Sequence, residues 1–464
     1  MATEPATRDE QILTFPPGFL WGVATSSHQY EGGNTNNQWY AWEQAGHIKS
    51  GDTCGLACDW WNAAERDFDA AQRMGLNALR LSLEWSRIEP RPGEWDARAL
   101  ERYRAMLRAL RDRNIAPMVT LHHFTNPLWF EERGAFLASD AIERFERYTA
   151  HAVEALGDLC DFWCTINEPN IYSIVGYQIG DFPPGRKGAV AATVRVQAAM
   201  ARAHAAAYTA IHRLQPAARV GWAQNINTFD PARPNSRLDW RIATLIDSAF
   251  NDFFPRAVRT GSARFPFSLA AGDLRAVKDT CDFVGINLYY RDLIHFDLRS
   301  ATQLFGRREV APGAPRSDQP VTGTWGEVYP AGIVRVAERV APLGKPIYVT
   351  ENGVADATDR LRPWQIAQAV KALHAALARG LDVRGYYHWS LVDNFEWAEG
   401  WATRFGLIAL DPATQERTPR RSAEFYSAIA HANALTPAML RAYAPTALAE
   451  IFPDSPAAVA PETH

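Results

Sequence analysis

Two glutamates stand at the ends of short apolar, β-favouring segments of this chain. Glu168 lies in Thr165-Ile-Asn-Glu-Pro169, and Glu351 lies in Val349-Thr-Glu-Asn-Gly353, roughly 180 residues further on. Two carboxylates that face each other across one pocket can cleave a glycosidic bond, one as proton donor and the other as nucleophile or base. Glycoside hydrolysis is therefore the first hypothesis for the chemistry of this chain.

The elements that must position these two residues follow from the hydrophobic pattern. Apolar, β-branched and aromatic runs predict eight strands, at residues 19–24, 78–85, 115–123, 161–168, 219–227, 282–290, 346–351 and 383–390. Helical patterns intervene at residues 63–74, 97–113, 140–156, 188–214, 238–258, 363–379 and 419–431. Eightfold alternation of strand and helix is typical of a closed parallel barrel. The expected fold is α/β, a single (β/α)8 TIM barrel with elaborated βα loops.

The barrel is expected to occupy residues 15–434, between an N-terminal extension (1–14) and a C-terminal tail (435–464). Asp96 is expected to cap the helix that follows it, and Gly75 and Gly380 are suited to the left-handed position after a helix. Residues 299–319 are polar, contain Pro and Gly, and predict a long loop. The tail is expected to hold one short helix, capped by Thr436 and ending before Pro445.

The C-terminal ends of the predicted strands concentrate residues that suit chemistry or sugar contacts. TIM barrels build their active sites at this end. The residues in question are His123, Asn167, Glu168, Tyr289, Glu351 and Trp389. A random scatter would put about half of such residues at the other end, so this convergence indicates a site.

Five motifs resemble those of family 1 glycoside hydrolases, the β-glucosidase and β-galactosidase group. They are residues 19–32, 121–124, 165–169, 349–353 and 389–397, and the similarity runs in order from about Phe15 to Ile429. Residues 351–356, followed by Arg-Pro at 362 and 363, are more similar to archaeal-type β-glycosidases than to plant enzymes. The resemblance implies a retaining double displacement with Glu351 as nucleophile and Glu168 as acid/base.

The same resemblance implies supporting roles for further residues. Arg80 would neighbour the nucleophile and Tyr289 would hydrogen-bond it. The implied sugar contacts are Gln29, His123, Asn167, Glu396 and Trp397, with Trp389 as a flat wall. Such a set is suitable because a sugar needs donors and acceptors for its hydroxyls and an aromatic plane for its C–H face. Five further residues are expected to be structural. They are His28, His122 and His388 beside the motifs, and Trp163 and Trp222, which are expected to pack in the core like most other tryptophans.

Two positions depart from the family pattern. His123-Phe124 stands where a His-Trp pair is usual, so a ring is kept but an indole N–H donor is lost. Thr324-Trp325-Gly326 exchanges the order of a Gly-Trp pair that normally places a Trp at the outer subsite. Trp325 is therefore a candidate for that subsite.

Composition narrows the partners and the compartment. The net charge of −4, from 48 basic and 52 acidic residues without a basic stripe, disfavours nucleic acid. The charged N-terminus lacks the apolar stretch of a signal peptide, and the Ala-rich residues 188–214 are interrupted by Arg and His, so neither export nor a membrane span is expected. Five cysteines leave at least one unpaired and favour a reducing cytoplasm. The sequence indicates no oligomeric state.

No metal or cofactor is expected. Two carboxylates suffice for the proposed chemistry, and the chain has no Gly-rich phosphate loop and no His-Glu-x-x-His pattern. Cys54 and Cys58 could pair or bind a metal, but no second ligand pair with zinc spacing accompanies them.

Three functions remain in competition. The leading one is an exo-β-glycosidase acting on terminal β-D-glucosyl residues, with β-D-galactosyl and β-D-fucosyl residues as further candidates. A non-catalytic sugar-binding barrel is disfavoured because both Glu168 and Glu351 are present. A 6-phospho-β-glycosidase would have Ser in place of the Glu-Trp pair and Lys and Tyr nearby, whereas this chain has Glu396-Trp397-Ala398.

Overall fold

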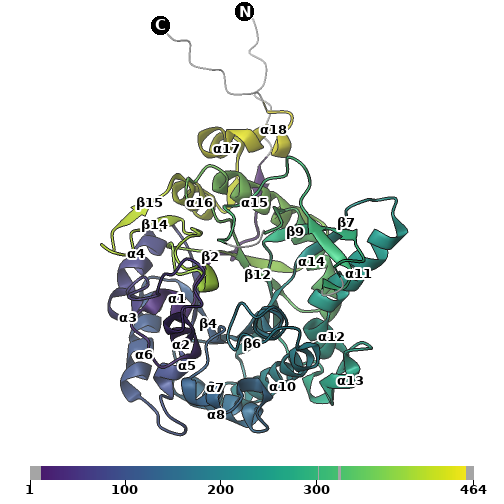
Figure 1. Ribbon diagram of the computed structural model, residues 1–464. Coiled ribbons are helices and arrows are strands. Elements are labelled where there is room, and N and C mark those ends of the chain that lie inside the picture. The colour runs from purple at the N-terminus through teal and green to yellow at the C-terminus, as the bar shows by residue number, and fades with distance from the viewer. Residues whose placement is uncertain (1–11, 301–302, 322–324, 456–464) are drawn as a thin grey trace, which may run out of the picture.

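The computed structural model describes residues 12–300, 303–321 and 325–455. Parts of the N-terminal extension (1–11) and of the tail (456–464), as well as Thr324, lie outside these ranges. At the centre of the molecule, eight parallel strands close into a barrel (Figure 1). In order around the barrel they are β12 (Ile347–Asn352), β13 (Val383–His388), β2 (Leu20–Ala24), β3 (Ala78–Ser82), β4 (Ala116–His122), β5 (Phe162–Asn167), β6 (Arg219–Asn225) and β8 (Phe283–Asn287).

All eight predicted strands are present, and the predicted TIM barrel is confirmed. Most residues of these strands are buried, as expected for parallel strands covered on both faces. Several strands end earlier than their apolar runs. The second predicted run, for example, extends to Trp85, but β3 ends at Ser82 because Trp85–Ile88 forms helix α5.

Helices surround the barrel (Figure 1). The longer ones are α4 (Glu65–Arg73), α6 (Ala97–Asp112), α8 (Ala141–Leu156), α10 (Val190–Leu214), α11 (Arg237–Asn251), α12 (Phe253–Thr260), α14 (Gly332–Val340), α15 (Arg362–Ala378) and α16 (Arg421–Ala432). Shorter ones are α1 (Ser27–Glu31), α2 (Gln38–Gln44), α3 (Trp60–Ala63), α7 (Leu128–Glu132), η1 (Ala135–Leu137), α9 (Pro169–Ser173), η2 (Ile174–Ile179), α13 (Ser268–Ala271), η3 (Arg275–Val277), η5 (Ala341–Leu343) and η6 (Trp397–Glu399).

Local sequence chemistry explains where several helices begin and end. Asp96 caps α6 by accepting hydrogen bonds from the backbone N–H groups of Arg98 and Ala99. Gly75 and Gly380 have φ values of 71° and 77°, the left-handed conformation predicted for them. The single helix expected over residues 238–258 is wrong, because α11 and α12 are separate helices. Pro255 has no N–H for the carbonyl of residue 251 and is accommodated in the first turn of a new helix.

A second sheet stands beside the barrel and was not predicted. It consists of β7 (Thr228–Pro231), β9 (Tyr290–Phe296), β10 (Gly306–Glu309) and β11 (Glu327–Val328). The long loop expected at residues 299–319 is therefore wrong in part, since β10 pairs antiparallel with β9. The residues of β10, Gly-Arg-Arg-Glu, contain no apolar run, so this strand depends on pairing that hydrophobic patterning cannot show.

Two segments far apart in the sequence pair with each other beside the barrel. Strand β1 (Leu13–Thr14) pairs antiparallel with β16 (Ala434–Leu435). As predicted, Thr436 caps a short helix, α17 (Pro437–Tyr443), by accepting a hydrogen bond from the N–H of Met439. Leu440 and Phe452 are buried in the main core. We therefore propose that the tail, as far as residue 452, is an integral cover of the barrel domain.

Four short elements complete the fold. Strands β14 (Ile408–Leu410) and β15 (Arg417–Pro419) form a two-stranded sheet, and η7 (Pro445–Ala447) and α18 (Leu448–Ile451) follow α17.

Trp163 and Trp222 are fully buried, as predicted for core residues. Within the described ranges, no helix has both the length and the apolar character to cross a membrane.

Candidate active site

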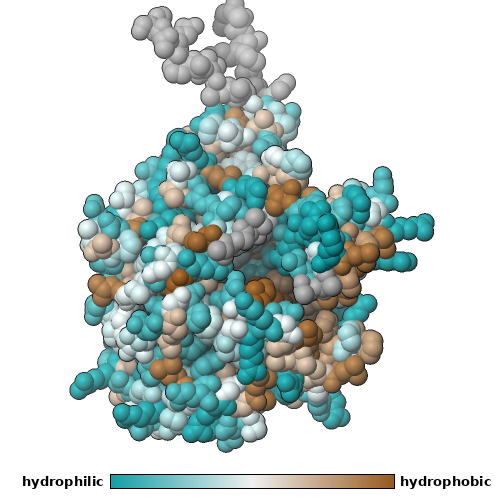
Figure 2. Space-filling view, in the orientation of Figure 1, coloured by the Kyte–Doolittle hydropathy of each residue, from teal (hydrophilic) through white to brown (hydrophobic). Residues whose placement is uncertain are grey.

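A pocket of about 370 Å³ lies at the C-terminal ends of the barrel strands. The molecular surface is hollowed near the centre of the molecule, above the barrel (Figure 2). Eight of the predicted site residues line this pocket: His123, Glu168, Tyr289, Trp325, Glu351, Trp389, Glu396 and Trp397. The other three, Gln29, Arg80 and Asn167, are fully buried and contact the lining residues from behind.

Glu351, on β12, is held by a cation and a phenol. Its Oε1 lies 2.6 Å from Arg80 Nη1, and its Oε2 accepts a hydrogen bond of 2.7 Å from the hydroxyl of Tyr289. Burial raises the pKa of Glu351, and the Arg80 guanidinium and the Tyr289 hydroxyl oppose that shift. These partners favour the ionised form of this carboxyl group.

Glu168 has only neutral partners. It follows β5 with a left-handed φ of 45°, and its Oε1 accepts hydrogen bonds of 2.8 Å from both Asn225 Nδ2 and Asn287 Nδ2. Burial, and next the negative charge of Glu351, raise its pKa to about 8. Because both amides donate to Oε1, the proton of the neutral acid belongs on Oε2.

The sequence prediction missed Asn225 and Asn287. Each is the last residue of its strand, β6 or β8. The predicted strands extended to residues 227 and 290, so neither asparagine lay at a predicted strand end. More exact strand boundaries would have placed both at the face of the barrel where sites are built.

Glu396 lines the pocket, and Gln29 contacts it from behind. Gln29 Nε2 donates hydrogen bonds to Asn394 Oδ1 (2.8 Å), to the carbonyl of Phe395 (2.8 Å) and to Glu396 Oε2 (3.3 Å). Gln29 thus fixes the segment that carries Glu396. Desolvation raises the pKa of Glu396 to about 8, and nearby carboxylates, first Glu351, contribute to the shift.

His123 is placed to donate a hydrogen bond into the pocket. Its Nε2 lies 3.1 Å from Asn167 Nδ2, which can only donate, so the ring proton of the neutral imidazole belongs on Nδ1. Nδ1 is buried and has no partner among the described residues. The ring is nearly parallel to those of Trp389 and Trp397, with centroids 6.0 and 5.9 Å away. The pocket lining therefore places a hydrogen-bond donor close to two aromatic rings, a combination that suits a sugar.

The two residues that depart from the family pattern both line the pocket. Phe124 packs edge-on against Trp397, with ring centroids 5.2 Å apart. Trp325 stacks on Tyr290, with ring centroids 5.4 Å apart and an interplanar angle of 26°. The assignment of Trp325 to an outer subsite remains a prediction.

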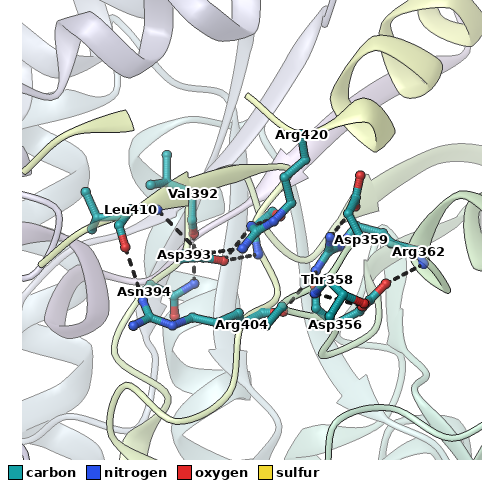
Figure 3. Close-up of polar contacts among 12 residues, drawn as sticks. Asp356, Thr358, Asp359, Arg362, Val392, Asp393, Asn394, Arg404, Leu410 and Arg420 are labelled. Carbon is teal, nitrogen blue, oxygen red and sulfur yellow. Dashed lines mark hydrogen bonds and ion pairs between the residues drawn. The ribbon is translucent and has the colours of Figure 1, made fainter. Parts of the chain in front are cut away.

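A buried polar network supports the loops that follow β12 and β13 (Figure 3). Arg420 forms two hydrogen bonds, of 2.9 and 2.8 Å, with the two carboxylate oxygens of Asp393, three residues before Glu396. Arg362 contacts Asp359 and the carbonyl of Asp356, and it also donates to the carbonyl of Arg404. The network thereby connects the loop after Glu351 with the loop that carries Glu396.

The described residues contain one group with the composition of a metal site, His28, Glu43 and Cys54. Its polar atoms are already engaged. Asn37 Nδ2 donates to His28 Nδ1, so the ring proton belongs on Nε2, which contacts Glu43 at 3.0 Å. A metal ligand would need Nε2 deprotonated, so we interpret this group as a hydrogen-bonded network.

The remaining cysteines and histidines of interest are buried. All five cysteines are free thiols, so Cys54 and Cys58 do not form a disulfide. Burial lowers the pKa of His122 to about 4 and holds that of His388 well below its ordinary value. Neither lines the pocket. This is consistent with the structural role expected for both.

Comparison with known proteins gives a family match over most of the chain. The sequence matches the model of glycosyl hydrolase family 1 over residues 11–435. A 1,4-β-D-glucan glucohydrolase of Thermotoga neapolitana is 30% identical, in a match that covers 91% of this chain and 99% of that protein. A β-galactosidase of Pyrococcus woesei is also 30% identical, over 91% of this chain and 98% of that protein. Among solved structures, a β-glucosidase from Thermotoga maritima in complex with glucoimidazole has a TM-score of 0.85 at 29% identity, covering 91% of this chain and 100% of that chain.

Proposed function

We propose, from the premise that this chain belongs to glycosyl hydrolase family 1 and is a β-glucosidase-type glycoside hydrolase, that it removes terminal β-D-glucosyl residues with retention of configuration. The family membership expected from the five sequence motifs is confirmed. The observation that carries the mechanism is the contrast between the two carboxyl groups. Glu351 has a guanidinium and a phenol as partners, whereas Glu168 has two amides.

In the first step, a carboxylate oxygen of Glu351 attacks the anomeric carbon and forms a glycosyl-enzyme ester. The bond from that carbon to the glycosidic oxygen breaks at the same time, and Glu168 Oε2 gives its proton to the departing oxygen. A pKa raised to about 8 keeps Glu168 protonated at neutral pH, so it can serve as the acid.

In the second step, a water molecule enters where the aglycone has left. Glu168, now a carboxylate, takes a proton from this water, and the resulting hydroxide oxygen attacks the anomeric carbon. The ester bond to Glu351 breaks and the sugar leaves with its original β configuration. Both enzyme carboxyl groups return to their starting protonation states. The two steps use only side chains, and we propose no metal or cofactor.

The sugar preference is proposed from the contacts at the Glu396 end of the pocket. Glu396 would accept hydrogen bonds from the 4- and 6-hydroxyls, and His123 Nδ1 would donate one. One of the similar proteins is a β-galactosidase, which supports the acceptance of galactosides and fucosides as weaker substrates. A 6-phosphate would bring a charge of about −1.5 to −2 into a pocket lined by the carboxylate of Glu351 and by the acidic side chains of Glu396 and Glu399. We therefore propose unphosphorylated substrates.

One experiment tests both the stereochemistry and the substrate class. NMR spectra taken early during cleavage of 4-nitrophenyl β-D-glucoside should show the β anomer of glucose before mutarotation. A panel of nitrophenyl β-glycosides should show glucoside cleavage at least a hundredfold above that of the 6-phosphoglucoside in kcat/KM. An α-glucose first product would contradict the retaining mechanism. Equal cleavage of the 6-phosphoglucoside would contradict the proposed role of Glu396.

A further inference from the structure

The pocket has one wall that the reaction at the anomeric carbon does not use. Ile171, Val175 and Ile179 all line it, from α9 and the π-helix η2. A spacing of four residues places side chains on the same helical face, so the three aliphatic groups form one stripe. Ile179 is 46% exposed, which means that the stripe continues from the interior to the molecular surface.

A second wall of the pocket is aromatic. The stacked pair of Tyr290 and Trp325 lines the pocket together with Phe405, whose ring centroid lies 5.8 Å from that of Trp325. Hydrophobic residues border the hollow in the space-filling view (Figure 2). The lining therefore offers both an aliphatic and an aromatic surface to the group that leaves the sugar.

Three charged residues of the pocket lining, Lys49, Asp181 and Glu399, already bind one another. Lys49 Nζ lies 2.8 Å from Glu399 Oε1 and 3.0 Å from Asp181 Oδ2. Glu399 Oε2 accepts a hydrogen bond of 2.8 Å from the N–H of Val321. The hydroxyls of a second sugar would have to compete with these contacts, and a buried hydroxyl left without a partner weakens binding.

Asn225 contributes a further polar group to the pocket lining. Its Oδ1 is buried and has no partner among the described residues. Its amide nitrogen donates to Glu168, so this acceptor lies next to the proposed proton donor. This oxygen can accept a hydrogen bond from a hydroxyl near the glycosidic oxygen. The aliphatic and aromatic walls remain apolar.

We propose that this end of the pocket selects an apolar aglycone, such as an alkyl chain, over a second sugar. The proposal rests on the function proposed above and specifies its substrate class. The physical basis is burial of apolar surface between the two walls, which favours binding by up to about fourfold for each methylene group that leaves water. A hydroxylated sugar ring of similar size gains less from the same surface.

The test compares leaving groups of similar chemistry. Methyl, butyl, hexyl and octyl β-D-glucosides and cellobiose all release an alcohol, so differences in kcat/KM report mainly the aglycone contacts. We expect kcat/KM to rise two- to fourfold per methylene from methyl to hexyl, and hexyl glucoside to exceed cellobiose by at least tenfold. Concentrations must stay below those at which the longer glucosides form micelles.

A pair of variants locates the effect. Ile179→Ser should lower the octyl-to-methyl ratio of kcat/KM by at least threefold, because it interrupts the aliphatic stripe. Leu245→Ser is the matched control, since Leu245 is also 46% exposed and lies on α11, outside the pocket lining. It should leave the ratio unchanged.

The outcomes separate this proposal from the one on which it rests. Cleavage of all glucosides with no gain along the alkyl series, and with cellobiose as good as hexyl glucoside, would overturn the apolar-aglycone proposal alone. A failure to cleave any β-glucoside would overturn both proposals. An equal effect of Ile179→Ser and Leu245→Ser would show that the stripe does not select the aglycone.

Discussion

Glu168 and Glu351 illustrate how the same side chain acquires two protonation states within one pocket. Each lies near the other's charge, so both cannot ionise without cost. The guanidinium of Arg80 lies against Glu351, while Glu168 receives only amide donors. The single proton that the pair shares near neutral pH should therefore reside on Glu168. This partition is what acid catalysis with a carboxylate nucleophile requires.

Replacement of the proposed nucleophile should remove turnover. In Glu351→Ala the covalent intermediate cannot form, and we expect kcat to fall by more than the roughly 10²- to 10⁴-fold that general acid–base assistance supplies. Added azide should restore activity and give the α-glycosyl azide, because a small anion can attack from the vacated face. Activity of this variant within tenfold of wild type, measured with 4-nitrophenyl β-D-glucoside, would exclude Glu351 as nucleophile.

The alkaline limb of the pH profile should report Glu168. Its pKa of about 8 means that the acid loses its proton above that pH, so kcat/KM should fall there. Glu168→Ala should flatten this limb and should slow alkyl glucosides far more than dinitrophenyl glucosides, which need no proton to depart. Glu396→Gln is the comparison, because the pKa of Glu396 is also about 8. If that variant flattened the limb and Glu168→Ala did not, the assignment would be wrong.

At the scale of single residues, the sequence predicts the groups that belong to recognisable motifs. Eight of eleven predicted site residues line the pocket and the other three contact them. Asn225 and Asn287 were missed because an asparagine in an apolar run has no distinctive pattern of its own. Their importance comes from a shared contact with Glu168, which arises because β6 and β8 follow β5 in the order of the barrel strands.

At the scale of elements, the barrel was predictable and the additions to it were less so. A strand buried on both faces leaves a long apolar run, as β5 and β12 do. The short strand β10 is polar and pairs with β9 across a loop, so its stability comes from a partner distant in sequence. The break between α11 and α12 depended on Pro255, whose effect on helix bonding was identifiable from the sequence.

The loop that carries Glu396 should depend on the ion pair beneath it. Arg420 and Asp393 are both nearly inaccessible, with side chains 10% and 2% exposed. Arg420→Met would leave a buried carboxylate without its cation, which costs about 3–5 kcal/mol. We expect that loss in the free energy of unfolding measured with urea, together with a higher KM for glucosides, since Gln29 contacts both Asn394 and Glu396.

Two variants control for this effect. Arg420→Met combined with Asp393→Asn should recover part of the lost stability, because the uncompensated charge is gone. Arg384→Met removes the exposed pair with Asp382, whose side chains are 56% and 51% exposed, and should cost at most about 1 kcal/mol. An equal loss in Arg420→Met and Arg384→Met would show that the buried pair does not support the loop.

At the scale of the whole molecule, buried titratable groups should make stability depend on pH in two directions. Burial raises the pKa of Glu31 to about 7 and those of Glu168 and Glu396 to about 8, from an ordinary value of 4.5. Burial also lowers the pKa of His122 and His204 to about 4, from 6.5. The two effects oppose each other between pH 4.5 and 6.5, and of these groups only the carboxyls act above pH 6.5.

The carboxyl groups bind protons more tightly in the folded state. Their contribution is complete below pH 4.5 and is lost as the pH rises through 7 and 8. The histidines bind protons more tightly in the unfolded state. Their contribution is complete above pH 6.5 and is lost as the pH falls toward 4. Above pH 6.5 only the carboxyl groups still change the stability, so the free energy of unfolding should fall as the pH rises from 6.5 to 8.5.

Urea unfolding at pH 6.5 and 8.5 should show this loss, and Glu168→Gln should identify one of its causes. A neutral amide cannot lose a proton, so the variant should lose less stability than wild type between pH 6.5 and 8.5, by about 1–2 kcal/mol. Glu94→Gln is the matched control, because Glu94 is a surface residue whose side chain is 61% exposed. It should follow the wild-type pH dependence.

A wild-type protein more stable at pH 8.5 than at pH 6.5, or a Glu168→Gln variant with the wild-type slope, would show that the buried acid does not destabilise the fold at alkaline pH. The expected result would mean that the proton held for catalysis is also a proton on which the stability of the barrel depends.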